Sequence, residues 1–199
     1  MSPNVSDRLF GILNHPDFLA MKGLANEVPI FIQTYEPQDE DKTRRLVEDL
    51  AARLRASGIS VAVVDLFDLI LDQLEEEGRL EQIMEREPSL EKRKMFDLMS
   101  NLADPKTRLI PRLMAAIGEE GAQLALLTGV GRVYPFLRTH TILESLQPAM
   151  VSLPVVMFFP GRYEQDENGA SVLRLFGSLP SPPIYRPYYR AFNLDHYRL

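Results

Sequence analysis

Two glycines in the second half of the chain are the first candidates for chemistry. Gly129 and Gly131 directly follow the apolar run 124–127 and the polar Thr128, where glycine lets the backbone turn sharply or come close to a ligand. A dinucleotide-binding fingerprint needs a third glycine at position 134, which is Tyr134 here, and a P-loop needs a Gly-Lys-Ser/Thr tripeptide, which the sequence lacks. The pattern argues against nucleotide binding of a known type, and simple turn formation is the competing interpretation. A ligand-binding alternative, enzymatic or nucleotide-responsive, would use a rim formed by Thr34, Gly129, Gly131 and Gly161.

Basic and aromatic residues near these turns form a second candidate group. Arg138 and His140 follow the first glycine turn, and Arg162 and Tyr163 follow a Pro-Gly pair at the end of a second apolar run. If the two runs are adjacent parallel strands, all four side chains reach one edge of the sheet, where ligands bind in open α/β folds. Such a group could bind an anion or a carboxylate of a partner protein. The alternative is that Arg138 pairs with an internal acid such as Glu144.

The residues that known catalytic or metal chemistry requires are missing or badly spaced. The three histidines have no paired spacing and there is no cysteine, which excludes disulfides and thiolate sites. His15 precedes a proline, and we expect it to cap a helix or face solvent. Asp65 ends one predicted strand, but the next is apolar and ends in Thr128, and no Gly-x-Ser-x-Gly elbow is present. The sequence therefore predicts no catalytic residue, no metal and no cofactor, and leaves open only a magnesium site made of carboxylates.

The C-terminal tail combines arginine with aromatic residues. Between Arg174 and Leu199 there are four arginines and one aspartate, interleaved with Tyr185, Tyr188, Tyr189, Phe192 and Tyr197. Such side chains can anchor a protein interface, stack on nucleic-acid bases or complete the hydrophobic core. All three interpretations stay open, and the candidate partner-binding residues of the tail are Tyr188, Tyr189 and Arg190.

The elements that would position these residues follow a βα pattern. Short, continuous apolar runs bounded by Gly or Pro are typical of strands buried on both faces, and helical sequence separates them. We predict a three-layer α/β fold with a mostly parallel, Rossmann-like sheet. The predicted strands are 29–34, 60–65, 123–127 and 154–159, with an edge strand or hairpin partner at 171–176; the helices that flank them are 5–13, 40–57 and a short one beginning at Ile142, where Thr141 and Glu144 have capping-box spacing.

A helical insertion at about 68–118 departs from this pattern. Its segment 72–91 holds eight acids and two arginines, a local net charge of −6. Charge runs of this kind usually form a solvated helix face, and the functional alternative is a hairpin that docks a basic partner. A further helix at about 106–117 should begin or kink near Pro111. We expect one domain over 1–199.

Composition sets the remaining bounds. The chain of 199 residues is 45% hydrophobic with a formal net charge of −6, which argues against wholesale coating of nucleic acid. No apolar run approaches the roughly 18 residues of a membrane span, and the N-terminus lacks the apolar core of a signal peptide. We expect a cytoplasmic protein that makes no membrane contact.

Four segments together resemble the BrxB family of small proteins from BREX bacteriophage-exclusion systems. They are Gly-Val-Gly-Arg-Val-Tyr-Pro-Phe-Leu-Arg-Thr-His from Gly129, Pro-Val-Val-Met-Phe-Phe-Pro-Gly-Arg-Tyr from Pro154, Leu-Arg-Leu-Phe-Gly from Leu173, and Tyr-Tyr-Arg-Ala-Phe from Tyr188. The resemblance covers the whole length and is strongest from Gly129 onward.

This resemblance implies a bacterial antiviral defence component. It would work beside a PglZ-type phosphatase-like protein, a PglX methyltransferase and a large ATPase. Because it carries over no catalytic residues, it favours a non-enzymatic adaptor, with the PglZ-type protein as the expected partner, other BREX subunits as further partners, and nucleic acid as an open question.

Overall fold

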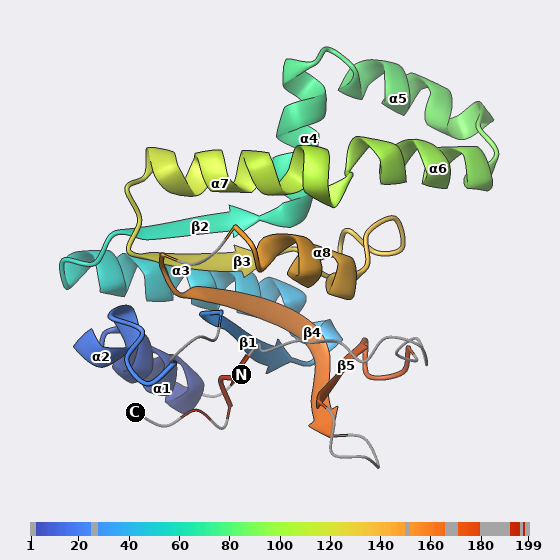
Figure 1. Ribbon diagram of the computed structural model, residues 1–199. Helices are drawn as coiled ribbons and strands as arrows, with labels where there is room; N and C mark the ends of the chain where they lie inside the picture. The colour runs from blue at the N-terminus through green and yellow to red at the C-terminus, as the bar shows by residue number, and fades with distance from the viewer. Residues whose placement is uncertain are drawn as a thin grey trace.

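A parallel sheet with helices on both faces organises the protein in the computed structural model, which describes residues 3–24, 28–149, 152–165, 171–179, 192–195 and 197 (Figure 1). The parallel strands of the described chain lie in the order β2-β3-β4-β1-β6. This confirms the predicted three-layer α/β fold and places all four predicted parallel strands in one sheet. The strands are β1 (Ile30–Tyr35), β2 (Val61–Asp65), β3 (Leu124–Thr128), β4 (Val155–Gln165), β5 (Ser171–Leu175), which pairs antiparallel with β4, and β6 (Phe192–Asn193).

The central runs of β1 to β4 are mostly apolar because both faces of these strands are buried. In β4, Val155 and Met157 enter one hydrophobic core, whereas Val156 and Phe158 enter the other. The other strands alternate in the same way, as the two-residue period of a strand requires. Two separate cores therefore lie above and below a single sheet.

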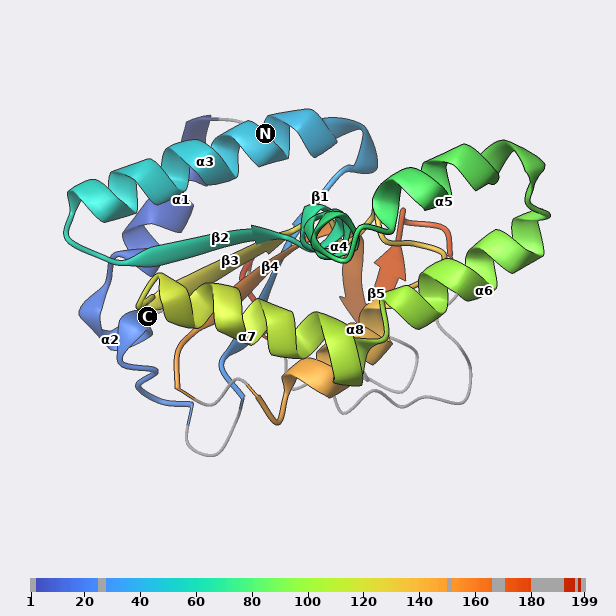
Figure 2. The ribbon, with the colours of Figure 1, turned by 90° about the horizontal axis from the view of Figure 1, so that it is seen from above.

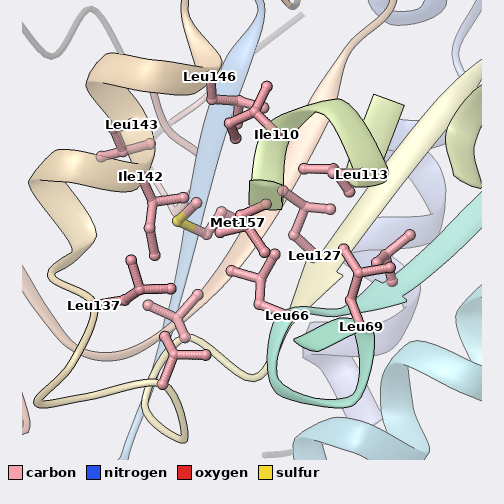
Figure 3. Close-up of a cluster of buried hydrophobic side chains, with 14 of the residues drawn as sticks. Leu66, Leu69, Ile110, Leu113, Leu127, Leu137, Ile142, Leu143, Leu146 and Met157 are labelled. Carbon is pink, nitrogen blue, oxygen red and sulfur yellow. The ribbon is translucent and has the colours of Figure 1, made fainter. Parts of the chain in front are cut away.

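Two groups of helices cover the two faces of the sheet (Figure 2). One face is covered by α1 (Pro3–Leu13), α2 (Pro16–Leu19) and α3 (Glu40–Ala56), and the other by α4 (Leu66–Glu76), α7 (Ile110–Glu119) and α8 (Thr139–Leu146). In the core that α4, α7 and α8 cover, Leu113 of α7 and Ile142 of α8 point toward Met157 of β4 (Figure 3). No helix of the described residues is long and apolar enough to cross a membrane.

Local sequence explains where several helices begin and end. Nδ1 of His15 accepts a hydrogen bond from the Asp17 N–H at 3.2 Å and caps α2, which confirms the capping interpretation of that histidine. Gly58 has φ +87° directly after α3, where the left-handed conformation stops the helix. Pro111 lies in the first turn of α7, where a missing N–H leaves no hydrogen bond unmade.

Within the helical segment predicted at about 68–118, a helical hairpin projects from the sheet (Figures 1 and 2), whereas α4 and α7 pack on the sheet. The hairpin consists of α5 (Leu80–Arg86) and α6 (Lys92–Leu102), and no residue from position 75 to position 101 is buried. A short 3-10 turn (Glu87–Ser89) joins the two helices, and a π-helical turn (Pro105–Leu109) leads into α7; a second 3-10 turn (Pro37–Asp39) precedes α3.

Two predicted details are wrong. Helix α8 begins at Thr139 rather than Ile142, so Thr141 lies inside the helix and forms no capping box with Glu144. Burial of Ile142, Leu143 and Leu146 against the core fixes this helix, and this packing outweighs the capping signal. The sequence analysis also missed β6, because a strand of two residues is too short to show a period.

Candidate functional site

Asp65 and Thr128 join the carboxyl ends of two neighbouring strands. The Thr128 hydroxyl donates to Asp65 Oδ2 at 3.0 Å, and Asp65 Oδ1 accepts from the N–H groups of Phe67 at 2.9 Å and Asp68 at 3.2 Å. Asp65 is thus the N-cap of α4. Both carboxylate oxygens already have partners inside the protein.

Arg132 completes this cluster from the loop after β3. Its Nη1 lies 3.1 Å from Asp65 Oδ1 and 2.9 Å from Asp68 Oδ1, and its guanidinium stacks 4.6 Å from the centre of the Phe67 ring. The Asp65 side chain is only 12% exposed, so the ion pair neutralises a charge that would be costly to bury alone. Within the described residues there is no group of three or more His, Asp or Glu placed to hold a metal ion.

The glycine turn packs directly onto this cluster. Gly129 has φ +75°, and a Cβ atom there would lie 2.2 Å from Asp65 Oδ1. A Cβ atom at Gly131 would lie 2.8 Å from Cγ of Pro160. Close approach of backbone to protein neighbours is therefore sufficient to explain both glycines.

A polar pocket of about 520 Å³ lies at the carboxyl ends of β1, β4 and β6. It brings together four residues singled out in the sequence, Thr34, Gly161, Arg162 and Tyr163. The parallel pairing of β4 with both β1 and β3 makes this edge of the sheet continuous. The other lining residues are Val5, Gln33, Tyr35, Glu36, Asp39, Glu164, Asn193 and Asp195.

A hydrogen-bonded network next to this pocket ties the C-terminal segment to the sheet. Asp195 accepts from the Thr34 hydroxyl at 2.7 Å and from the Gln33 amide at 2.7 Å, and it pairs with Arg8 at 3.1 Å. Arg8 also donates to the Gln33 side-chain oxygen at 2.8 Å and to the Leu194 carbonyl at 2.8 Å. Gln33 is 1% exposed, so these bonds satisfy a buried polar group. The sequence analysis did not single out this network, because its members lie up to 187 residues apart.

The exposed cation of the pocket is Arg162. Its side chain is 62% exposed and lies 4.0 Å from Glu164, which also accepts a hydrogen bond from Arg174 at 2.8 Å. Gly161 is required here, because a Cβ atom would lie 2.1 Å from the Arg174 carbonyl oxygen across the β4–β5 hairpin. The arrangement presents a guanidinium and a phenol on the β4–β5 hairpin at the pocket rim. The pocket is also lined by four acids, Glu36, Asp39, Glu164 and Asp195. Its net charge is therefore negative and does not favour a free anion.

Arg138 and His140 lie at the N-terminal end of α8 and are not among the residues that line this pocket. Burial lowers the pKa of His140, and the neighbouring Arg138 lowers it further while Glu144 opposes the shift. His140 is therefore neutral at pH 7 and does not act as a second cation.

The tail residues fall into two groups. Leu194 is fully buried, and the Tyr197 ring packs edge-on against Phe31 at 5.2 Å and Phe18 at 5.8 Å, so this part of the tail closes the core. Tyr188, Tyr189 and Arg190 lie outside the described residues.

The geometry defines a three-layer α/β protein whose strand ends are tied together by internal ion pairs and hydrogen bonds. The family model described as "BREX protein BrxB" matches residues 62–194, and the chain belongs to this family. It is 33% identical to "BREX protein BrxB" of Bacillus cereus (strain H3081.97) over 94% of each chain. It is 30% identical to "BREX protein BrxB" of Escherichia coli O9:H4 (strain HS), over 92% of this chain and 86% of the relative. No solved structure matches the chain.

Proposed function

We propose that this chain is a non-catalytic adaptor subunit of a BREX bacteriophage-exclusion complex. Its membership of the BrxB family supports a place in BREX defence. The adaptor role is supported chiefly by the contacts of Asp65, the carboxylate at the end of β2. Asp65 caps a helix, accepts a hydrogen bond from Thr128 and forms an ion pair with Arg132. A carboxylate already engaged as a helix cap and in an ion pair favours a structural role over the binding of substrate or metal.

The glycine turn favours the same role. A nucleotide-responsive site would leave the space over Gly129 and Gly131 to a phosphate, whereas here Asp65 and Pro160 occupy it. The close backbone approach that suggested ligand binding at these two glycines instead serves packing within the protein.

The partner of this adaptor is the PglZ-type phosphatase-like protein. Protein interfaces draw much of their energy from a few Tyr and Arg anchors, and the chain has no tryptophan. Arg162 and Tyr163 are the candidate anchors at the pocket rim. The further candidate anchors are Arg138, His140, Tyr188, Tyr189 and Arg190.

Co-expression with each neighbouring BREX protein in turn tests this function. We expect the PglZ-type protein to co-purify in a stable complex, and we expect the purified chain neither to hydrolyse ATP nor to cut DNA in magnesium. Turnover that disappears in an Asp65→Asn or Arg162→Ala variant would overturn the adaptor role. If the chain forms complexes with other BREX subunits but none with the PglZ-type protein, the assignment of the partner is wrong and the adaptor role is retained.

A further inference from the structure

The α5–α6 hairpin, hereafter the arm (residues 78–104), exposes two large apolar side chains that belong to neither core. Met84 of α5 is 63% exposed and Phe96 of α6 is 42% exposed. The side chains of Leu80, Ile83, Leu98 and Met99 pack against the core that α7 and α8 cover, so one side of the arm is seated and the other is uncovered. Apolar side chains gathered on a projecting element are typical of interaction sites.

Ion pairs and hydrogen bonds fix the base of the arm. Glu76 at the end of α4 accepts two hydrogen bonds from the Arg112 guanidinium of α7, one at 2.8 Å. Glu77 pairs with Arg108 at 3.0 Å, and the Ser100 hydroxyl donates to the Phe136 carbonyl at 3.2 Å. A docking surface held at its base in this way binds with less loss of conformational entropy than a loose segment.

A groove of about 310 Å³ runs between the two helices of the arm. Its apolar lining residues are Ile83, Leu90 and Leu98, and its polar ones are Arg79, Gln82, Arg86 and Lys94. No acid lines it, although the segment 72–91 carries a net charge of −6. The net charge of the segment 72–91 favours a basic partner for this hairpin. The groove itself is apolar and basic, so it favours a partner with acidic groups.

Two of the lining cations, Arg79 and Lys94, already form ion pairs, but these pairs are weak enough for a partner to replace. Arg79 lies 3.4 Å from Glu77, and Lys94 lies 3.3 Å from Glu91 with both side chains more than two-thirds exposed. Exposed pairs of this kind contribute at most about 1 kcal/mol. A carboxylate of a partner can replace them at little cost.

We infer that the groove of the arm is a second docking surface, separate from the Arg162–Tyr163 pocket, and that it takes an amphipathic helix of another protein. Two helices that expose apolar residues along a shared groove accept the apolar face of a third. Charge complementarity fixes the flanks of that third helix as acidic, because Arg79, Arg86 and Lys94 line the groove.

The test uses two synthetic peptides as probes. Both are helical with leucines at i, i+3, i+4 and i+7, and the flanking positions are Glu in one and Lys in the other. Fluorescence anisotropy should show binding of the Glu peptide to the full-length protein, weakening with added salt, and at least tenfold weaker binding of the Lys peptide. The Arg86→Glu, Lys94→Glu double variant should lose the Glu peptide by at least tenfold.

A matched control lies on the same helix. Lys92 and Arg93 are exposed on α6 but do not line the groove, so the Lys92→Glu, Arg93→Glu double variant makes the same charge change elsewhere. It should retain most of the binding, and circular dichroism should show both double variants folded. Equal losses in the two double variants, equal binding of the two peptides, or no binding of either would overturn the inference.

Two further measurements test whether a second copy of this chain occupies the groove and whether the groove acts independently of the proposed PglZ-binding surface. A dimer in size-exclusion chromatography with light scattering, dissolved by Leu90→Asp in the groove, would show that a second copy of the chain covers the groove and would overturn the inference. The groove variant should still bind the PglZ-type protein through Arg162 and Tyr163. Loss of that complex in the groove variant, with the Arg162→Ala variant binding normally, would contradict the existence of two separate surfaces.

Discussion

The Thr128 hydroxyl donates to Asp65 Oδ2 at 3.0 Å and thereby links the carboxyl ends of β2 and β3. In many α/β proteins the corresponding edge is where a ligand binds. Here an internal network ties this edge together, since Arg132 adds a cation and Gly129 packs its backbone against the carboxylate, and a pocket of about 380 Å³ opens beside Asp65 and Thr128. The conformations of the glycine turn therefore serve packing within the protein, and the surfaces proposed for recognition are the neighbouring pocket and the arm.

A Gly129→Ala substitution should destabilise the protein. The residue has φ +75°, and the new Cβ would overlap Asp65 Oδ1, so both the backbone and the helix cap must shift. The expected loss is about 2 kcal/mol of unfolding free energy, typical of strain combined with a disturbed cap. Urea unfolding followed by circular dichroism measures it.

Gly118 supplies the control for this substitution. It lies within α7, and an added Cβ would meet no atom within 4 Å. Gly118→Ala should raise stability by about 0.5–1 kcal/mol, because alanine is the better helix former. A Gly129→Ala protein as stable as wild type would show that Asp65 is not confined as described.

An Asp195→Ala substitution should release the C-terminal segment from the sheet. It would leave the buried Gln33 amide without its 2.7 Å partner and Arg8 without its ion pair. The expected cost is about 1–3 kcal/mol, and hydrogen exchange should speed up at Leu194 and along β1. Asp7→Ala is the matched control, because Asp7 pairs with Arg53 on an exposed surface and should cost less than about 1 kcal/mol. Equal losses of unfolding free energy in the two variants would show that Asp195 does not hold the C-terminal segment to the sheet.

Periodicity predicted the central sheet well because its cause is local. Runs such as 155–159 are apolar at every position since both faces of the strand are buried, and the intervening helices carry their own stripes, as α3 does with Val47, Leu50 and Leu54. Gly58 and Pro111 mark helix ends through backbone conformation alone. These signals need no tertiary information.

The site depends on contacts that no local pattern contains. Asp65 and Thr128 were each visible as strand ends, but their hydrogen bond depends on β2 and β3 being neighbours. The network of Arg8, Gln33 and Asp195 joins the two ends of the chain. The start of α8 was predicted wrongly because a capping pattern was weighed without the core against which the helix packs.

Stability at the base of the arm should depend on pH through Glu76. Hydrogen bonding to Arg112 lowers the pKa of Glu76 below its ordinary value of 4.5. A carboxylate whose folded-state pKa is lowered contributes stability that is fully present above the unfolded value and is lost as pH falls through the folded pKa. The stability difference between wild type and Glu76→Gln should thus be present at neutral pH and vanish in acid.

The neighbouring Glu75 provides the comparison for this titration, because it is exposed on the same helix and one residue away. Glu75→Gln should change stability little at any pH. Thermal unfolding of the three proteins across the acid range measures the effect, and a Glu76→Gln difference that grows on acidification would contradict the direction of the shift.

Binding of the PglZ-type protein should depend on Arg162 and Tyr163 beyond any effect on fold stability. Both lie on the rim of the pocket, and the Arg162 side chain is 62% exposed, so its truncation removes contact atoms rather than core. Tyr163 also packs against the core, so Tyr163→Ala should lower the melting temperature as well. Replacing a central anchor by Ala should cost on the order of 2 kcal/mol, about a thirty-fold loss of affinity. Arg45→Ala on the exposed face of α3 is the matched control and should bind as wild type. The measurement is paired, with thermal unfolding and partner affinity determined on the same proteins.

The tail is tested in the same assay. If Tyr188→Ala, Tyr189→Ala and Arg190→Ala lower the melting temperature and leave binding proportional to the folded fraction, those residues complete the core rather than contact the partner. If they weaken binding at unchanged melting temperature, the interface extends onto the tail. Wild-type affinity in these three variants, in Arg138→Ala, and in both pocket variants would exclude every proposed anchor but His140. His140 and the arm would then be the remaining candidate surfaces for the partner.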